Sequence, residues 1–359
     1  MGPDSLPRNV LSKATGKEEM FRITHRIGGD SYIVNRSHVL TLRHQSGEIR
    51  DVPLEYYLKY PTGYKGVRSG YSLPEAKLPL DPYWFGLWLG DGHHKRPEIT
   101  TQEPEIKDYV RQYAYSLGYS YAELKNGEHG LIQAKIKGFQ GKSHKIVDTL
   151  KSHNLYGNKH VPEIFMCSHE NQRLHLLAGL IDSDGTLVNK KHSYYEFCNK
   201  NLEVASATKA LALSCGLMST MKQYGDYYKV RISGEIQKIP CLVKRKVCPE
   251  TYKPYKKVTD SSLVVESLGI GDYCGFTLDG DHRFILENCI VSHNTAKQGE
   301  ADWILGIGRS MDNDEQDYRF FHLPKSKLMG DEDIVEEYRH GKFKVRILPD
   351  VARYEDVVF

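Results

Sequence analysis

Apolar and polar residues alternate along two stretches near the N-terminus, 21–27 (FRITHRI) and 31–44 (SYIVNRSHVLTLRH). A period of two predicts β-strands, and Gly28-Gly29-Asp30 between them predicts a hairpin turn. The same alternation returns within residues 258–294, as SSLVVESL and YCGFTLDGDHRFILENCIVSHN. The stretch 61–82 is rich in Gly and Pro, which predicts a linker. We therefore expect β-rich segments on both sides of a mixed helix and strand region.

The mixed region contains an internal repeat. Segments 84–92 (WFGLWLGDG) and 177–185 (LAGLIDSDG) share the pattern xxGxxxxDG. Three more pairs follow in order: 115–119 with 213–217, 132–138 with 228–234, and 159–162 with 246–249. The four offsets are 93, 98, 96 and 87 residues. Four echoes at a nearly constant offset indicate a tandem duplication with pseudo-two-fold symmetry, which suits a substrate of matching symmetry such as duplex DNA.

Each repeat opens with an apolar helix that ends in Asp-Gly. Small residues on these helices let two backbones approach closely; they are Gly86, Gly90, Ala178, Gly179 and Ser183. If the helices pack in parallel, Asp91 and Asp184 converge at their C-terminal ends, where the helix dipole favours cations. Gly92 and Gly185 are expected to end the helices in a left-handed turn. Two carboxylates in this setting predict a Mg²⁺ site that activates water at a phosphodiester.

The acidic motif has two other interpretations. A single Asp-Gly after an apolar helix is usually a cap followed by a turn, so the metal site depends on the motif being duplicated. A calcium loop beginning at Asp182 is the second alternative. It needs a further carboxylate or amide and a bidentate Glu, which Thr186, Val188 and the following lysines do not supply.

The motif LAGLIDSDG differs by one residue from the signature of the LAGLIDADG (dodecapeptide, or DOD-type) homing endonucleases, and FGLWLGDG is a looser variant. The chain resembles this family over about residues 80–250. The resemblance implies that Asp91 and Asp184 bind the metal and that the protein makes double-strand breaks in DNA. It also implies that the backbone carbonyls of Gly90 and Ser183 help to hold the ion.

Two lysines are further candidates. Lys159 stands in a Lys-x-x-Pro block that the family carries near its active site, and Lys246 matches it through the internal repeat. The resemblance implies a catalytic role, since a cation there could lower the pKa of a water or stabilise a developing phosphorane. A plain surface lysine is the alternative, with more weight for Lys246.

Residues 287–295 (ENCIVSHNT) carry a second chemistry. The side-chain amide of Asn294 can attack its own backbone carbonyl and cleave the following peptide bond, leaving a succinimide. His293 can polarise that carbonyl or protonate the leaving amine, and Thr295 can accept an acyl group. A loop that merely caps a strand is the alternative for His-Asn-Thr alone. However, His282 lies twelve residues upstream of Asn294 in a strand-turn-strand segment.

Residues 265–295 resemble the C-terminal blocks of inteins, with DGDHRF followed by VSHN. A second resemblance covers residues 31–42 (SYIVNRSHVLTL), which are similar to the intein block whose histidine, here His38, helps to activate the upstream scissile bond. Asn35 stands where that block commonly has Thr. The resemblance implies an α+β chain in which a β-rich Hint-type splicing domain is interrupted by a pseudo-two-fold αββαββα endonuclease. The expected domains are 1–78 and 256–294 (splicing domain), 79–255 (endonuclease) and 295–359 (C-extein).

The N-terminus departs from the intein pattern. Inteins begin with Cys or Ser, whereas this chain begins Met1-Gly-Pro-Asp-Ser, which the resemblance places just inside the first block, and the surroundings of Ser5 do not fit that start. We therefore expect no cis-splicing by this chain alone. Either a separate N-terminal intein fragment supplies the missing piece, or the chain starts at an internal Met; cleavage at Asn294 stays chemically feasible.

Charge separates the last 65 residues from the rest. Residues 295–359 hold 10 Lys+Arg and 14 Asp+Glu, so residues 1–294 hold 39 and 32 of the totals of 49 and 46. Residues 222–257 alone hold ten basic and three acidic residues with interleaved tyrosines, which suits either a phosphate-facing or a solvated surface. The tail resembles the C-terminal end of a phage-type RecA-like replicative helicase. GKS at 141–143 lacks the upstream Gly of a Walker A loop, since Ile136 stands there.

Further features bear on location and function. The seven cysteines form no CxxC pair; without an export signal or a membrane-length apolar run they predict a cytoplasmic protein with reduced thiols and no membrane partner. The first hypothesis is a Mg²⁺-dependent endonuclease that cuts the intein-less host gene and retains C-terminal splicing chemistry. The second is a splicing element whose endonuclease domain only binds DNA. The third, a DNA-binding regulator without intein function, conflicts with the Ser-His-Asn-Thr end.

Overall fold

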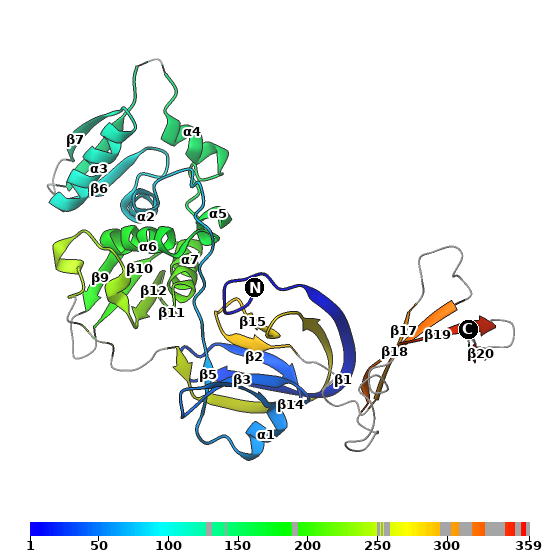
Figure 1. The fold of residues 1–359 in the computed structure, drawn as a ribbon. Helices are drawn as coiled ribbons and strands as arrows, with labels where there is room; N and C mark the ends of the chain where they lie inside the picture. The colour runs from blue at the N-terminus through cyan, green and yellow to red at the C-terminus, as the bar shows by residue number, and fades with distance from the viewer. Residues whose placement is uncertain are drawn as a thin grey trace. The chain divides into compact units, whose positions relative to one another are not determined.

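The computed structural model describes residues 1–126, 131–140, 142–188, 193–249, 252, 254, 259–294, 303–308, 318–326, 342–348 and 353–356. The chain divides into two compact units. Unit 1 comprises Met1–Cys274 and Leu278–Asn294, and unit 2 comprises Gly275–Thr277 and Thr295–Phe359. Within unit 1 we call residues 1–69, 259–274 and 278–294 the β-rich part, and residues 70–249 the repeat region (Figure 1).

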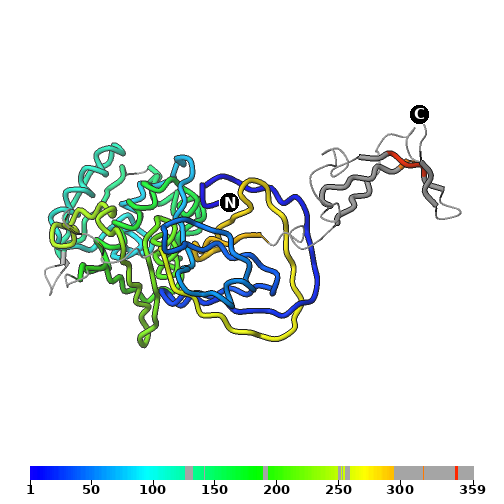
Figure 2. Tube along the Cα trace, turned by 60° about the horizontal axis from the view of Figure 1, so that its bottom comes forward, coloured from blue at the N-terminus to red at the C-terminus, as the bar shows by residue number. Residues whose placement is uncertain are grey.

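The β-rich part consists of short strands and two long ones that lie side by side. They are β1 (Val10–His25), β2 (Ser31–Asn35), β3 (Val39–His44), β4 (Ile49–Pro53), β5 (Tyr64–Val67), β13 (Asp260–Ser261), β14 (Leu263–Leu278), β15 (Arg283–Ile285) and β16 (Val291–His293), with helix α1 (Leu54–Lys59). The sheet orders are β14-β1-β2, β13-β5-β3-β4 and β15-β16. Figure 2 shows β1, in blue, and β14, in yellow, as long curved neighbours.

The predicted N-terminal hairpin is confirmed, with one difference. β1 pairs antiparallel with β2, with Ile23 opposite Tyr32, and Gly28 and Gly29 in the turn have φ of 94° and 73°. The stretch 31–44 is two strands, not one, because a turn at Asn35–His38, closed by the His38 N–H on the Asn35 carbonyl, sends β3 into another sheet. His38 therefore stands where the chain changes sheets.

A buried apolar cluster fills the β-rich part. Its fully or nearly buried members come from β1 to β4 and α1: Phe21, Ile23, Val34, Leu40, Leu42, Val52, Leu54 and Tyr57. The alternation read from the sequence explains this, since every second residue of a strand faces the same side. The N-terminus closes the end of the fold, where the Ile285 N–H donates to the Met1 carbonyl at 3.0 Å.

The first half of the repeat region departs from the expected order αββαββα. Its elements are α2 (Pro82–Asp91), β6 (Glu98–Thr101), α3 (Pro104–Ser116), β7 (Ser120–Asn126), β8 (Leu131–Lys137), α4 (Lys145–Ser152) and α5 (Glu163–Met166). Its sheet has three strands in the order β6-β8-β7. The first expected strand is reduced to one bridge between Gly92 and Ile99. The five residues before β6 include Pro97, which cannot donate to a ladder.

The second half follows the expected order until its last helix. Its elements are α6 (Glu170–Asp184), β9 (Gly185–Val188), β10 (Tyr194–Asn199), α7 (Leu202–Ser214), β11 (Met218–Tyr224) and β12 (Tyr227–Ser233). The sheet order is β11-β12-β10-β9. Two short 3₁₀ turns, Ile236–Lys238 and Lys244–Lys246, replace the last helix. Gly118 and Gly216, from the second sequence echo, follow α3 and α7 with φ of +75° and +73°.

Helices α2 and α6 pack backbone against backbone, as the small residues predict (Figure 1). A Cβ added at Gly86 would lie 2.3 Å from the Leu176 carbonyl oxygen, and one at Gly179 would lie 2.2 Å from that of Tyr83. Near the helix ends, Gly90 faces Ser183 and Asp184. Contacts advance along both helices in the same sense, so the helices run parallel. Around them, one apolar core joins both halves; Trp84, Phe85, Trp88, Leu177 and Ile181 are fully buried.

The expected left-handed turns after the two motif helices are wrong. Gly92 has φ −77° and ψ 151°, and Gly185 has φ −102° and ψ 164°, both extended. Glycine is needed there for space, because an added Cβ would lie 2.4 Å from the Trp88 carbonyl oxygen at Gly92 and 2.7 Å from Ile181 at Gly185. The chain turns directly from helix into strand, which places each aspartate at the junction.

The predicted linker at 61–82 is not uniformly irregular. Residues 64–67 form β5, and Arg68 bridges Ile290 in the β-rich part. Beyond it, the Tyr71 N–H donates to the Ser214 carbonyl. The Tyr71 carbonyl accepts from the fully buried Arg173, whose guanidinium also bonds the Ser168 carbonyl and the Ser214 hydroxyl. The second part of this segment is therefore tied to the repeat region.

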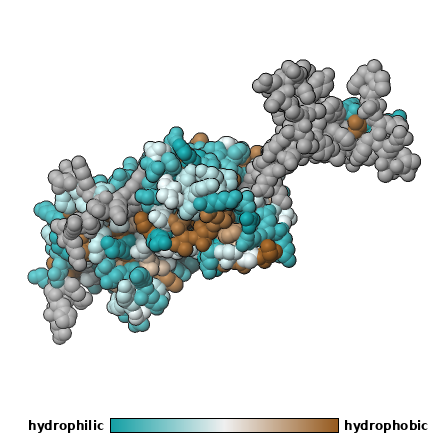
Figure 3. Space-filling model, turned by 90° about the horizontal axis from the view of Figure 1, so that it is seen from below, coloured by the Kyte–Doolittle hydropathy of each residue, from teal (hydrophilic) through white to brown (hydrophobic). Residues whose placement is uncertain are grey.

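Unit 2 contains a four-stranded antiparallel sheet in the order β17-β18-β19-β20. The strands are β17 (Trp303–Gly308), β18 (Tyr318–Ser326), β19 (Lys342–Leu348) and β20 (Arg353–Asp356). Among the described helices of the whole chain, none combines the length and apolar character that a membrane crossing needs. The face of unit 1 in Figure 3 is mostly polar, with apolar side chains gathered in one area.

Candidate functional site

Asp91 and Asp184 are the last residues of α2 and α6, and both side chains are half-buried. A Cβ added at Gly90 would lie 3.2 Å from Oδ2 of Asp184. The second carboxylate therefore lies beside the residue that precedes the first. With Lys159 and Lys246, described next, these residues form what we call the carboxylate site.

The pKa values of this pair reflect burial and proximity. Burial, and then the nearby Asp184 charge, raises the pKa of Asp91 to about 6. Burial also raises the pKa of Asp184, while a hydrogen bond from Asn199 and the two lysine charges oppose the rise. Two carboxylates in one poorly solvated place disfavour double ionisation. A cation bound between them would relieve that cost.

Lys159 reaches the C-terminal end of α2. Its Nζ donates to the carbonyl oxygen of Gly90 at 3.0 Å and of Gly92 at 2.7 Å. The ammonium also lies 5.3 Å from the ring centre of Trp88. Burial lowers the pKa of Lys159 to about 8, and the two aspartate charges oppose this shift. The side chain thus brings positive charge to the edge of the carboxylate pair.

Lys246 makes the equivalent contact at the end of α6. Its Nζ donates to the carbonyl oxygens of Ile181, Asp182 and Ser183 at 2.9, 2.8 and 3.2 Å. The residue is only 2% exposed, and burial lowers its pKa. The surface-lysine alternative is therefore wrong for Lys246. The structure places both lysines at equivalent positions, as the repeat predicts.

Several polar residues that no sequence motif indicates support this site. Asn199 Nδ2 donates to Asp184 Oδ2 at 2.7 Å, and Asn201 Nδ2 donates to the Lys159 carbonyl at 2.7 Å. The Tyr195 hydroxyl donates to the Lys246 carbonyl at 2.6 Å. Asn201 caps α7, which is a readable helix-start signal; nothing in the sequence links Asn199 or Tyr195 to the site.

The buried Asp182 is a further missed residue. Its Oδ2 accepts from the Tyr83 hydroxyl at 2.7 Å and from the N–H groups of Leu242 and Val243 at 2.6 and 3.3 Å. It therefore fixes the segment that leads to Lys246. The alternative of a calcium loop starting at Asp182 does not fit these contacts, because one oxygen is already taken by three donors.

The donor set suits a hard cation. It contains two carboxylates with the carbonyls of Gly90 and Ser183, at the helix ends where the dipole is negative. Each carbonyl accepts one lysine hydrogen bond, and a carbonyl oxygen has a second lone pair for another partner. Within the described residues no group of three or more His, Cys, Asp or Glu lies close enough to hold a metal. A cation here would therefore depend on the aspartate pair and on carbonyl or water oxygens.

A second cluster lies at the end of unit 1, and we call His38, His282, His293 and Asn294 the asparagine site. Asn294 is 3% exposed, and neither atom of its carboxamide has a hydrogen-bond partner among the described residues. Its N–H donates to the His282 carbonyl at 2.9 Å. His293 Nδ1 bonds the Asn294 carbonyl oxygen, the atom where negative charge would develop if that carbonyl were attacked.

His38 and His282 complete the asparagine site from two other segments. His38 Nε2 lies 3.3 Å from the Ser292 hydroxyl, and burial lowers its pKa to about 3. The rings of His282 and His293 have centres 5.9 Å apart. Thr295 lies outside the described residues. The Ser5 hydroxyl accepts from the Ser72 N–H and is not part of this cluster.

A known protein family matches the second half of the repeat region. Residues 171–239 match the model of the LAGLIDADG-like domain. This stretch contains α6 with Asp184 and the strands β9 to β12. The chain therefore contains a LAGLIDADG-like domain within its mixed α and β structure.

Two curated proteins are similar to parts of the chain. The replicative DNA helicase DnaB of Mycobacterium intracellulare is 30% identical over 146 residues, covering 40% of this chain and 21% of the helicase. The homothallic switching endonuclease of Saccharomyces cerevisiae is 31% identical over 150 residues, covering 37% of this chain and 25% of that protein. The chain thus spans a quarter or less of the length of each relative.

Solved structures of the homing endonuclease I-DmoI are also similar. A set of mesophilic variants gives 17% identity and a TM-score of 0.34, covering 43% of this chain and 88% of that one. The complex with DNA and Mn gives 17% identity and a TM-score of 0.33, covering 43% and 89%.

Proposed function

We propose that the chain is an intein-borne, site-specific DNA endonuclease that makes double-strand breaks with Mg²⁺. The observation that carries the proposal is the meeting of Asp91 and Asp184 at the ends of two parallel, closely packed helices. The LAGLIDADG-like match and the similarity to a switching endonuclease support it. The DNA partner is the host gene without the insertion, and the proposed location is the cytoplasm of the host or phage-infected cell.

Each residue of the carboxylate site has a proposed role. Asp91 and Asp184, with the carbonyls of Gly90 and Ser183, would hold Mg²⁺, which when bound activates water and neutralises phosphodiester charge. Lys159 and Lys246 orient those carbonyls and offset the negative charge of the aspartate pair. Because Lys159 is the less buried of the two, it is the better placed to meet a phosphate.

Cutting of a plasmid that carries the uninterrupted host gene tests the proposal. Wild type should linearise the plasmid with Mg²⁺ and not with EDTA, and Asp184→Asn should lose this activity. Asp108→Asn is a matched control, since Asp108 is an exposed acid on α3 paired with Arg111. If wild type binds the plasmid specifically but never cuts it with metal, the domain only binds DNA, which is the alternative function.

We also propose a second function, cleavage of the peptide bond after Asn294, as in the last stage of protein splicing. The unpartnered, buried carboxamide of Asn294, with His293 on its carbonyl, favours it. The Hint-type splicing fold of the β-rich part belongs to this proposal. So does the assignment of residues 295–359 to a replicative helicase as C-extein, which the similarity to DnaB supports.

Mass measurement of the purified chain tests the second function. Cleavage should give one fragment ending in a succinimide at residue 294 and another beginning at Thr295. The variant Asn294→Ala should stay intact under the same conditions. A wild-type chain that stays intact as well would contradict the second function and leave the endonuclease proposal standing.

A further inference from the structure

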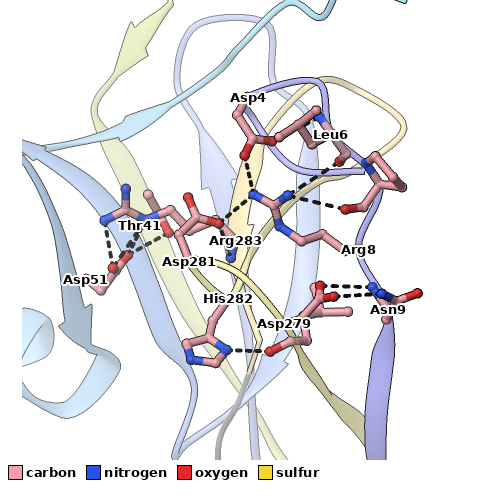
Figure 4. Close-up of polar contacts among 12 residues, drawn as sticks. Asp4, Leu6, Arg8, Asn9, Thr41, Asp51, Asp279, Asp281, His282 and Arg283 are labelled. Carbon is pink, nitrogen blue, oxygen red and sulfur yellow. Dashed lines mark hydrogen bonds and ion pairs between the residues drawn. The ribbon is translucent and has the colours of Figure 1, made fainter.

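The turn that carries His282 is held from outside by the start of the chain (Figure 4). The backbone N–H and the side-chain Nδ2 of Asn9 donate to the two carboxylate oxygens of Asp279, at 2.9 and 2.8 Å. The Asp279 N–H in turn donates to the Asn9 carbonyl at 3.2 Å. Three hydrogen bonds between two residues fix the first position of the turn against β1.

Arg8 holds the middle of the same turn. Its Nη2 lies 2.8 Å from Asp281 Oδ1 and 2.7 Å from Asp4 Oδ2, and its side chain is only 6% exposed. A Cβ added at Gly280 would lie 3.1 Å from Nε of Arg8, so the guanidinium also lies against the backbone of the turn. An arginine that is paired with two carboxylates and largely desolvated is costly to displace.

His282 adopts a backbone conformation that needs such support. Its φ is +61°, in the left-handed region that costs a non-glycine residue about 1 kcal/mol or more. Its Nδ1 bonds the Leu278 carbonyl, and its own carbonyl accepts the N–H of Asn294 at 2.9 Å. A shift of the turn would therefore move the Asn294 backbone, and with it the geometry between the carboxamide and the scissile carbonyl.

The opposite side of the turn has its own anchor. Arg283 makes a two-pronged ion pair with Asp51, with the shortest contact at 2.7 Å, and Asp51 also accepts from the Thr41 hydroxyl at 2.9 Å (Figure 4). Arg283 pairs with His293 between β15 and β16. We expect this second anchor to keep the turn folded when the contacts from Arg8 are lost.

We propose that Arg8 and Asn9 are positioning residues for peptide-bond cleavage after Asn294, an inference that rests on the second function above. In that reaction Nδ2 of Asn294 forms a bond to its own carbonyl carbon, and the bond to the nitrogen of Thr295 breaks. One Nδ2 proton is lost and the leaving amine gains one, so no co-reactant is consumed. Arg8 and Asn9 touch none of the reacting atoms and act through Asp279, Asp281 and His282.

The test measures the rate at which the 295–359 fragment appears from the full chain, by mass. Arg8→Gln should slow cleavage about tenfold, the equivalent of about 1.4 kcal/mol, and Arg8→Lys should recover part of the rate because it keeps the charge near Asp281. The double variant of Arg8→Gln with Asp281→Asn should be no slower than Arg8→Gln alone, since Arg8→Gln already removes the ion pair between Arg8 and Asp281.

Arg36→Gln is the matched control. Arg36 also pairs with two carboxylates, those of Glu19 and Glu55, but it is half-exposed and does not contact the turn. Its cleavage rate should stay within about twofold of wild type, which corresponds to less than 1 kcal/mol. Equal slowing of Arg8→Gln and Arg36→Gln would mean general destabilisation and would overturn the proposal.

Two further outcomes are decisive. If Arg8→Gln cleaves at the wild-type rate, the positioning role is overturned and the second function is left intact. A wild-type chain that does not cleave would remove the second function and this inference together. In that case, unchanged hydrogen exchange of the Asn294 amide in Arg8→Gln would show that the turn is not held from the N-terminus either.

Discussion

At the carboxylate site four ionisable side chains gather at two helix ends, whereas at the asparagine site the amide and His38 are uncharged and buried. The first is made by one motif used twice, so two aspartates and two lysines arrive by symmetry. The second takes its residues from chain positions as far apart as 38 and 294. Duplication is thus an economical way to assemble a charged site. A site built from distant segments needs anchors that no motif repeats.

The largest expected effect concerns the helix pair on which the carboxylate site depends. Gly86→Ala and Gly179→Ala should each lower the free energy of unfolding by about 3 kcal/mol, because the added Cβ meets backbone oxygen at 2.3 and 2.2 Å. Chemical denaturation measures this. Gly118→Ala is the control, with a φ of +75° but open space around it, and should cost about 1 kcal/mol. Similar costs at all three glycines would contradict close backbone packing.

The next effect separates the two lysines within the carboxylate site. Lys246→Met should lower the free energy of unfolding by about 2 kcal/mol more than Lys159→Met, because it leaves three carbonyls, not two, without their donor in a more buried place. Thermal and chemical denaturation of both variants measure the difference. Equal losses would show that the two halves are energetically equivalent despite the difference in burial.

The two sites should respond to pH with opposite signs. The folded pKa of His38, about 3, lies below its usual 6.5, so its stabilising contribution is present above pH 6.5 and is lost as pH falls toward 3. The folded pKa of Asp91, about 6, lies above its usual 3.8, so its contribution is present below pH 3.8 and is lost as pH rises through 6.

Unfolding measured between pH 7 and 4 tests these signs. His38→Gln should flatten the loss of stability on acidification by about 1.4 kcal/mol per pH unit at most, and Asp91→Asn should steepen it. His25→Gln is a useful comparison, because His25 is also fully buried with a pKa lowered to about 3. Unchanged slopes in both His38→Gln and His25→Gln would mean that neither ring is held neutral.

The smallest expected effect tests a hydrogen bond to Asp184 that has no counterpart at Asp91 within the described part of the chain. Asn199→Ala removes the 2.7 Å hydrogen bond to Asp184. It should raise the activation free energy of DNA cutting by about 1 kcal/mol, which slows cutting several-fold, and leave the free energy of unfolding nearly unchanged. Nicking of each DNA strand, measured separately, reports the effect. Loss of all cutting would mean that Asn199 does more than orient one carboxylate.

The repeated motif predicted more of the carboxylate site than of anything else in the chain. Gly86, Gly179 and the two Lys-x-x-Pro blocks were readable because each occurs twice at a nearly constant offset. The strands of the β-rich part were readable from their alternation. The conformations of Gly92 and Gly185 were not, since crowding against the preceding helix turn, and not a positive φ, selects glycine there.

Residues that act once, through contacts far along the chain, escaped prediction. Asp182 meets Tyr83 and the segment before Lys246, and Arg173 meets Tyr71 and Ser214. Such pairs have no period and no fixed spacing, so only the folded chain shows them. The sequence also did not predict that the expected first strand of the first half is reduced to one bridge, because a single bridge at Gly92 leaves no pattern in the sequence.

Between Arg68 and Tyr71 the chain stops bonding to the β-rich part and starts bonding to the repeat region. This change determines where the chain could be shortened. Arg68 and Ser69 bond Thr259 and Cys289, whereas Tyr71 is fastened to Ser214 and Arg173. A shorter version without the repeat region should therefore be ligated from Ser69 directly to Thr259. A shortened chain that kept residues 70–78 would leave this segment without the Arg173 guanidinium and the Ser214 backbone carbonyl that hold it.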